Sequence, residues 1–110
     1  MLAHEFSIID QLSTQAYHPY EPERYGCIKV SDSDIVPLLE ELGARLFTYI
    51  HSLDRPATGL AYGGVTLIPP ASLGEFRDIL LSRHNPAYDA LIALIGEAME
   101  QDRFMIHFGI

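Results

Sequence analysis

Residues 59–73 are Gly-Leu-Ala-Tyr-Gly-Gly-Val-Thr-Leu-Ile-Pro-Pro-Ala-Ser-Leu, a segment in which one strand ends and one helix begins. The strand is predicted from the β-rich run Val65–Ile68, because the two prolines that follow it cannot donate the backbone hydrogen bonds of a strand ladder. The helix is predicted over residues 72–83, because Ser72 and Glu75 have the spacing of a capping box in which Ser72 is the N-cap. The rest of the chain must supply partners for both elements.

The hydrophobic periodicity of the remaining chain predicts those partners. Leu60–Tyr62 either belongs to the same strand, bent at a glycine pair, or forms a second short strand. Residues 4–12 have apolar side chains at both helical and strand spacing, and we favour a short strand. Gly43 is expected to end the first helix as its C′ glycine, and residues 54–59 are expected to form a turn or short loop. The other expected elements are strands at Cys27–Val30, Leu46–Leu53 and Arg103–Ile110, and helices at about residues 35–42 and 86–99.

These elements predict one α+β domain over residues 1–110, with a mostly antiparallel sheet of four to five strands and three helices packed on one face. The expected order is strand, strand, helix, strand, strand, helix, helix, strand. The hairpin over residues 46–68 and the C-terminal strand are expected at the centre of the sheet, because so apolar a terminal strand must dock between other strands. The face of that strand expected to be buried carries Phe104, Ile106 and Phe108.

The chain is strongly acidic, with 15 Asp and Glu against 7 Lys and Arg and a net charge of −8. Residues 1–54 hold nine of the acids and three of the bases, so the first half alone carries a charge of −6. A surface of this sign repels nucleic-acid phosphates and favours a basic partner protein. The alternative is that the charge serves solubility alone.

Composition also gives expectations about location. No run approaches the ~20 apolar residues of a membrane span, and the first residues lack the pattern of a signal peptide. Cys27 is the single cysteine, so it cannot form an intramolecular disulfide, which suits a reducing compartment. We therefore expect a cytoplasmic protein with no membrane partner and no nucleic-acid partner.

A tyrosine-rich loop is expected at residues 15–26, where two prolines bias the backbone toward extended conformations. Its tyrosines alternate with acidic residues, and tyrosine offers a large contact area with few torsions to freeze, which suits an interface. The alternative is that the tyrosines pin a long loop to the domain. Asp32 and Asp34 follow at the start of the first helix, where capping is their expected structural role. The expected partner-binding residues are Tyr17, Tyr20, Glu21, Glu23, Tyr25, Asp32 and Asp34.

No catalytic or metal-binding motif stands out in the sequence. The five histidines lack the i, i+4 spacing of a zinc helix and there is no Cys-x-x-Cys, so we expect no metal and no cofactor. His51 and His107 lie on expected strands and could meet across the sheet, with Tyr62 completing a polar pocket. Two half-buried, hydrogen-bonded histidines are the plainer interpretation of that pair.

Three segments resemble small bacterial proteins of the immunity type, which accompany polymorphic or contact-dependent toxins: Tyr25-Gly26-Cys27, residues 63–73 and residues 104–110. The resemblance implies a cytoplasmic, non-enzymatic protein that neutralises a toxin by binding it. Its partner would be a basic toxin domain that meets the acidic, tyrosine-rich surface. The alternative from another class is a small enzyme or ligand-binding domain with a pocket lined by His51, Tyr62 and His107.

Overall fold

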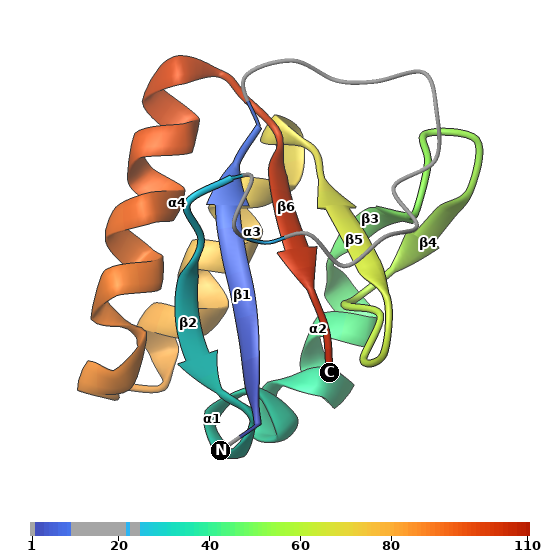
Figure 1. Ribbon diagram of the computed structural model, residues 1–110. Coiled ribbons are helices and arrows are strands. Elements are labelled where there is room, and N and C mark those ends of the chain that lie inside the picture. Colours follow the sequence, from blue (N-terminus) through green and yellow to red (C-terminus); the bar gives the residue numbers. More distant parts are fainter. Residues whose placement is uncertain (1, 10–21, 23–24) are drawn as a thin grey trace.

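The computed structural model describes residues 2–9, 22 and 25–110, and these form one antiparallel sheet with helices against it (Figure 1). The strand order is β2-β1-β6-β5-β3-β4. The strands are β1 (Ala3–Ile8), β2 (Ile28–Ser31), β3 (Phe47–Ile50), β4 (Pro56–Thr58), β5 (Val65–Ile68) and β6 (Met105–Phe108). The helices are α1 (Asp32–Ile35), η2 (Val36–Leu38), α2 (Leu39–Arg45), α3 (Pro70–Ser82), η3 (Pro86–Tyr88) and α4 (Asp89–Gln101).

The α+β class and the antiparallel sheet are confirmed, but the sheet has six strands rather than four to five. The additional strand is β4, which pairs with β3 where a turn or short loop was expected. It escaped prediction because three residues are too few to show a period, and its proline is tolerated at the edge of a sheet. Leu60–Tyr62 is not a strand, since β5 begins only at Val65.

The C-terminal strand lies inside the sheet, as its apolar sequence predicts. β6 pairs with β1 on one side and with β5 on the other, so both of its hydrogen-bonding edges are used. β3 lies one strand from the edge, between β5 and β4. At the opposite edge of the sheet β2 pairs with β1, and this confirms the short strand that was predicted within residues 4–12.

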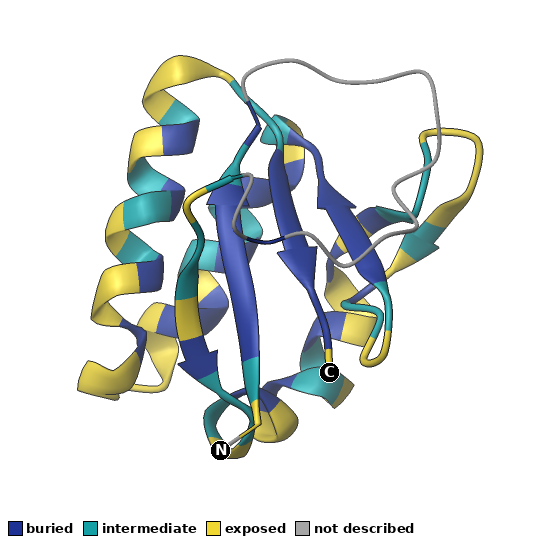
Figure 2. Cartoon of the chain, in the orientation of Figure 1, coloured by how far each residue is buried: buried dark blue, intermediate teal, exposed yellow. Residues whose placement is uncertain are grey.

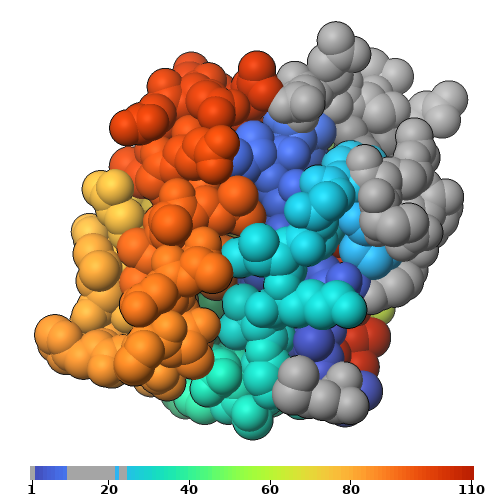
Figure 3. All heavy atoms as spheres, turned by 60° about the vertical axis from the view of Figure 1, so that its left-hand side comes forward, coloured from blue at the N-terminus to red at the C-terminus, as the bar shows by residue number. Residues whose placement is uncertain are grey.

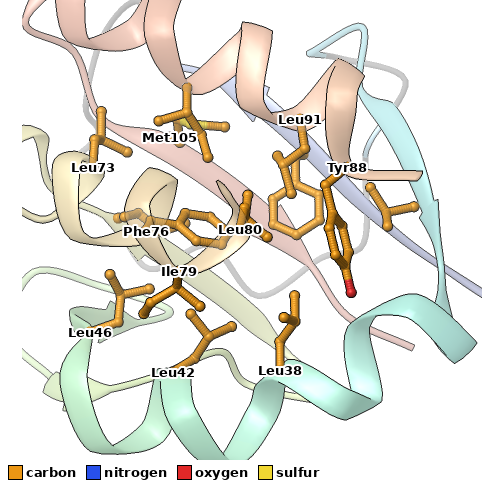
Figure 4. Packing of buried hydrophobic residues seen from close by; sticks show 14 of the residues in the cluster. Leu38, Leu42, Leu46, Leu73, Phe76, Ile79, Leu80, Tyr88, Leu91 and Met105 are labelled. Atoms are coloured by element: carbon orange, nitrogen blue, oxygen red, sulfur yellow. The ribbon is translucent and has the colours of Figure 1, made fainter. Parts of the chain in front are cut away.

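The central strands of the sheet are buried along most of their length (Figure 2), and the two faces of the sheet bury separate sets of side chains. On the helix side, residues from α2, α3 and α4 pack against Phe6, Ile68 and Met105 of the sheet (Figure 4). The other face carries a smaller cluster of buried residues: Ile9, Val65, Leu67, Ile106 and Phe108.

Phe104 is a correction to the expected burial of the last strand. It lies just before β6 and is only half-buried, although it packs against the second cluster with its ring 6.4 Å from that of Tyr49. Ile106 and Phe108 are buried as expected. Because Phe104 is only half-buried, its contribution to stability falls below that of a fully buried phenylalanine.

The start of α3 also differs from the prediction. The helix begins at Pro70 with Pro69 as its N-cap, so Ser72 lies inside the first turn and not at the cap. Proline suits this position because the first amides of a helix have no partner within the helix. The Ser72 hydroxyl instead donates to the carbonyl oxygen of Phe47 at 2.7 Å and ties α3 to β3.

Gly43 does not end the first helical stretch, because α2 continues through it to Arg45. Gly59, which has a φ of 72°, has a steric role at this helix. A Cβ on Gly59 would lie 2.9 Å from the Cα of Gly43, so the backbones of α2 and the segment after β4 approach too closely for any side chain.

Candidate functional site

A chain of buried polar side chains crosses three strands near the end of the sheet where α1 begins. The Nε2 of His4 lies 2.9 Å from the Oδ1 of Asp32. The Nδ1 of His4 lies 2.8 Å from the Nε2 of His107. The Nδ1 of His107 lies 3.2 Å from the Oγ1 of Thr66. β1, β6, β5 and α1 are thereby joined by one continuous set of hydrogen bonds.

Strand alternation explains why these residues meet. His4 and Phe6 share the helix-side face of β1, and His107 shares the corresponding face of β6 with Met105. His107 lies directly opposite Phe6 on one side and Thr66 on the other in the strand register. Directly opposed residues on one face have neighbouring Cβ atoms, so the register itself brings the imidazole to the hydroxyl.

The network has one consistent arrangement of protons when Asp32 is ionised and both imidazoles are neutral. A carboxylate only accepts, so the Nε2 of His4 carries a proton and its Nδ1 accepts when the ring is neutral. The Nε2 of His107 must then donate to His4, and its Nδ1 must accept from the Thr66 hydroxyl. The Oγ1 of Thr66 in turn accepts from the backbone N–H of Ala61 at 2.8 Å. Each of these hydrogen bonds therefore has a defined donor.

Asp32 is the point at which this network reaches the surface. Its side chain is 21% exposed, whereas that of His4 is 0% exposed. The Tyr62 hydroxyl donates to the second carboxylate oxygen, Oδ2, at 3.2 Å. The rings of Tyr62 and His4 are also in contact, with centroids 5.5 Å apart. A buried imidazole and a surface tyrosine therefore hold the two oxygens of one carboxylate.

The electrostatics of the network favour neutral imidazole at its inner end. Burial, followed by the charge that His4 can carry, lowers the pKa of His107 from 6.5 to about 3. The hydrogen bond to Asp32, followed by partial desolvation, raises the pKa of Tyr62. His107 therefore stays neutral and Tyr62 stays protonated at neutral pH.

This geometry limits the chemistry that the histidines can perform. Both His4 and His107 are 0% exposed, so neither imidazole can reach a substrate. Their facing nitrogens are 2.8 Å apart, and a zinc ion between two histidines would need roughly 2.0 Å to each nitrogen. Within the described part of the chain, no three His, Cys, Asp or Glu side chains are grouped so that they could hold a metal ion.

The residues of the alternative pocket are only partly brought together. His107 and Tyr62 both belong to the network, through His4 and Asp32. His51 follows β3 with a φ of 65°, and its Nε2 would lie 3.1 Å from a Cβ on Gly64. The imidazole in contact with His107 is that of His4, which the sequence analysis did not single out. The alternation of His4 and Phe6 along the first strand was the available signal.

The expected partner-binding residues fall into two groups. Tyr17, Tyr20, Glu21 and Glu23 lie outside the described residues. Tyr25 is half-buried, with its ring 5.7 Å from that of Phe108 and its carbonyl accepting from the Ser7 hydroxyl at 2.6 Å.

Asp32 and Asp34 stand at the start of α1, but their side chains do not cap it. The N-cap is Ser31, and no side-chain hydrogen bond caps the helix. Asp32 accepts from the histidine network instead, while the carbonyl of Asp34 accepts from the buried Tyr88 hydroxyl at 2.6 Å. Capping, the structural role expected for the two aspartates, is therefore replaced by tertiary hydrogen bonding.

Sequence reasoning also missed an ionic network on the helices. Arg45 of α2 donates to Glu41 of the same helix and to Glu75 of α3, and Arg83 also donates to Glu41. The hydrogen bonds from the two arginines hold the pKa of Glu41 below its usual range. Since all four groups are solvent-exposed or half-exposed, the network orients the helices without adding much stability.

Comparisons of the chain with protein-family models, with curated proteins and with solved structures found no match. Across the described residues, every helix is too short or too polar to cross a membrane.

Proposed function

We propose that this protein is a non-enzymatic binding protein whose acidic surface recognises a basic partner protein. The observation that carries the proposal is the net charge of −8 in a chain of 110 residues. The particular form proposed is a cytoplasmic immunity protein that neutralises a bacterial toxin, because the resemblance in the sequence implies that role. Many toxins that attack nucleic acids carry basic clefts, which an acidic surface can occupy in place of phosphate.

The distribution of charge on α4 supports this proposal. From Asp89 to Asp102 the chain contains four acidic residues and no lysine or arginine. All four carboxylates are exposed, and Figure 3 shows α4 as an outer ridge of the molecule. Acids at the C-terminal end of a helix oppose the helix dipole, so Glu100 and Asp102 do not serve the stability of α4.

The surface around α1 supports it as well. Asp32, Asp34 and Glu40 lie within nine residues of one another in the helical stretch that runs to Arg45. In the ion pairs described on this stretch, Arg45 and Arg83 both pair with Glu41. Asp32 is paired only through a histidine ring in the described ion pairs, so its charge is not balanced by a lysine or arginine there.

The same geometry disfavours the enzyme alternative, because one of its two candidate histidines, His107, is sealed in the core while His51 is not. His107 is 0% exposed and its pKa lies at about 3, so it is a poor general base at neutral pH and cannot touch a substrate. The network instead positions Asp32 at the surface, which suits binding.

The test uses the protein encoded by the gene immediately upstream of this one. Co-expression should relieve any toxicity of that protein, and calorimetry on the purified pair should give a one-to-one complex. A matched charge-reversal pair, Asp34→Lys and Arg55→Glu, should change the affinity in opposite directions. If the two proteins do not associate at low salt, the proposal fails for that partner and for the immunity role.

A further inference from the structure

We infer that Asp32 and Tyr62 form a recognition site for an arginine side chain of the basic partner, an inference that rests on the proposed function. The carboxylate of Asp32 is a fixed negative charge at the mouth of a buried network. The ring of Tyr62, whose residue is 43% exposed, stands beside it. Together they offer the two features that a guanidinium group uses, a carboxylate and an aromatic face.

The carboxylate has capacity left for an outside donor. Each of its oxygens can accept about two hydrogen bonds. In the described contacts Oδ1 accepts from His4 and Oδ2 accepts from Tyr62. The backbone N–H of Asp32 is already used, since it donates to the carbonyl of Leu2 at 2.9 Å. An arriving guanidinium therefore meets an anchored carboxylate with free lone pairs on both oxygens.

The two present donors differ in how firmly they are held. The His4 contact, at 2.9 Å, comes from a ring that is fully buried and fixed by His107 behind it. The Tyr62 contact, at 3.2 Å, is longer than the usual range for a hydroxyl donor and comes from an exposed side chain. A guanidinium donor carries a charge opposite to that of the carboxylate, whereas the Tyr62 hydroxyl is neutral, so arginine can replace this hydroxyl while His4 keeps the carboxylate in place.

Two exposed apolar residues lie next to this site along the backbone and suit the stem of an arginine. Leu2 and Ile110 are both exposed, and each is joined to the site by its backbone. Leu2 accepts from the Asp32 amide, and the Ile110 amide donates to the Tyr62 carbonyl at 2.7 Å. Figure 1 places the two marked chain ends and α1 at the same end of the sheet. An arginine buries its methylene stem on such a surface while its head group binds the charge.

The site favours arginine over lysine. A guanidinium is planar, can donate two parallel hydrogen bonds to a carboxylate and stacks on an aromatic ring, whereas an ammonium acts as a point charge. One side of the Tyr62 ring contacts His4, at an interplanar angle of 61°, so the exposed remainder of the ring is the surface on which the guanidinium stacks.

The test measures binding of hexa-arginine amide and hexa-lysine amide to the full chain by NMR titration at low salt. Hexa-arginine should move the Asp32 amide and the Tyr62 ring signals and should bind several-fold more tightly than hexa-lysine. Asp32→Asn should weaken hexa-arginine about tenfold, while the matched control Asp78→Asn, which removes the same charge from an exposed position on α3, should weaken it less than about twofold. Tyr62→Phe should keep the preference for arginine and Tyr62→Ala should abolish it.

Two outcomes would overturn the inference. Equal losses in Asp32→Asn and Asp78→Asn would mean that the peptide responds to total charge and has no preferred site. An unchanged preference for arginine in Tyr62→Ala would mean that the aromatic ring takes no part in recognition. This variant is expected to fold, because it alters an exposed side chain. If either result is found but the upstream gene product still binds, the proposed function stands and only the arginine site is wrong. If that protein does not bind but hexa-arginine still selects Asp32, only the proposed function is wrong.

Discussion

Acidification should destabilise the fold through His107 in particular. In the unfolded chain a histidine takes up a proton near pH 6.5, whereas in the folded protein burial lowers the pKa of His107 to about 3. Between these values the unfolded state binds one more proton than the folded state, so stability is complete above about pH 6.5 and falls as the pH falls. The slope is about 1.4 kcal/mol per pH unit, which gives about 3 kcal/mol between about pH 6.5 and pH 4.5.

The surroundings of His107 explain why the folded protein resists that proton. The ring packs against Phe6, with centroids 4.9 Å apart, and against His4, which would bring a second positive charge if protonated. Protonation would also turn the Nδ1 of His107 from an acceptor into a donor, so the Thr66 hydroxyl would lose the acceptor of its proton there. The carboxylate of the network, Asp32, is separated from His107 by the whole ring of His4.

Urea unfolding of the wild type and His107→Gln, followed by circular dichroism across this pH range, isolates the effect. The variant should be about 1–3 kcal/mol less stable at neutral pH, because it disturbs a buried hydrogen bond. Its stability should then fall less steeply, so that the two curves converge in acid. Carboxylates such as Glu41 are present in both proteins, so they do not contribute to the difference between the two curves. As a control, the stability of His84→Gln, which replaces an exposed histidine, should change with pH as that of the wild type does. Parallel curves for His107→Gln and wild type would refute the reasoning.

Three further predictions concern the fold and can be measured by urea unfolding. Gly109→Ala should lower the free energy of unfolding by several kcal/mol, because a Cβ there would collide with carbonyl oxygens of the turn before β5. Gly43→Ala has open space at its Cβ inside α2 and should raise that free energy by up to about 1 kcal/mol. Similar effects of the two substitutions would disprove the steric role of Gly109. Ser72→Ala should cost about 1–2 kcal/mol through the lost bond to β3, and a neutral result would show that this bond contributes nothing. Phe108→Ala should cost about 3–5 kcal/mol and Phe104→Ala clearly less, and the reverse order would contradict the observed burial.

The sequence predicted those elements whose pattern is local and long. α4 follows from apolar residues at helical spacing over 13 residues, and β6 follows from the apolar run at the end of the chain. β4 could not be predicted in the same way, because its three residues gain their structure only from pairing with β3. The start of α3 was misplaced because Ser72 has the chemistry of a cap, yet it uses its hydroxyl for a carbonyl 25 residues away in sequence.

The candidate site was less predictable than the fold for the same reason. His4 and His107 are separated by 103 residues, and their contact depends on a strand register that local sequence does not determine. Tyr62 and His107 were singled out because of their chemistry, and Asp32 because of its charge. Their connection required knowing that β6 lies between β1 and β5.

The central claim is that a basic partner is recognised by charge, and the salt dependence of association tests it most directly. Stopped-flow mixing with the upstream gene product should give fast association at low salt that slows markedly as salt rises, while dissociation changes little. Asp32→Asn should reduce both the association rate at low salt and its dependence on salt. An association rate that does not depend on ionic strength would contradict the account.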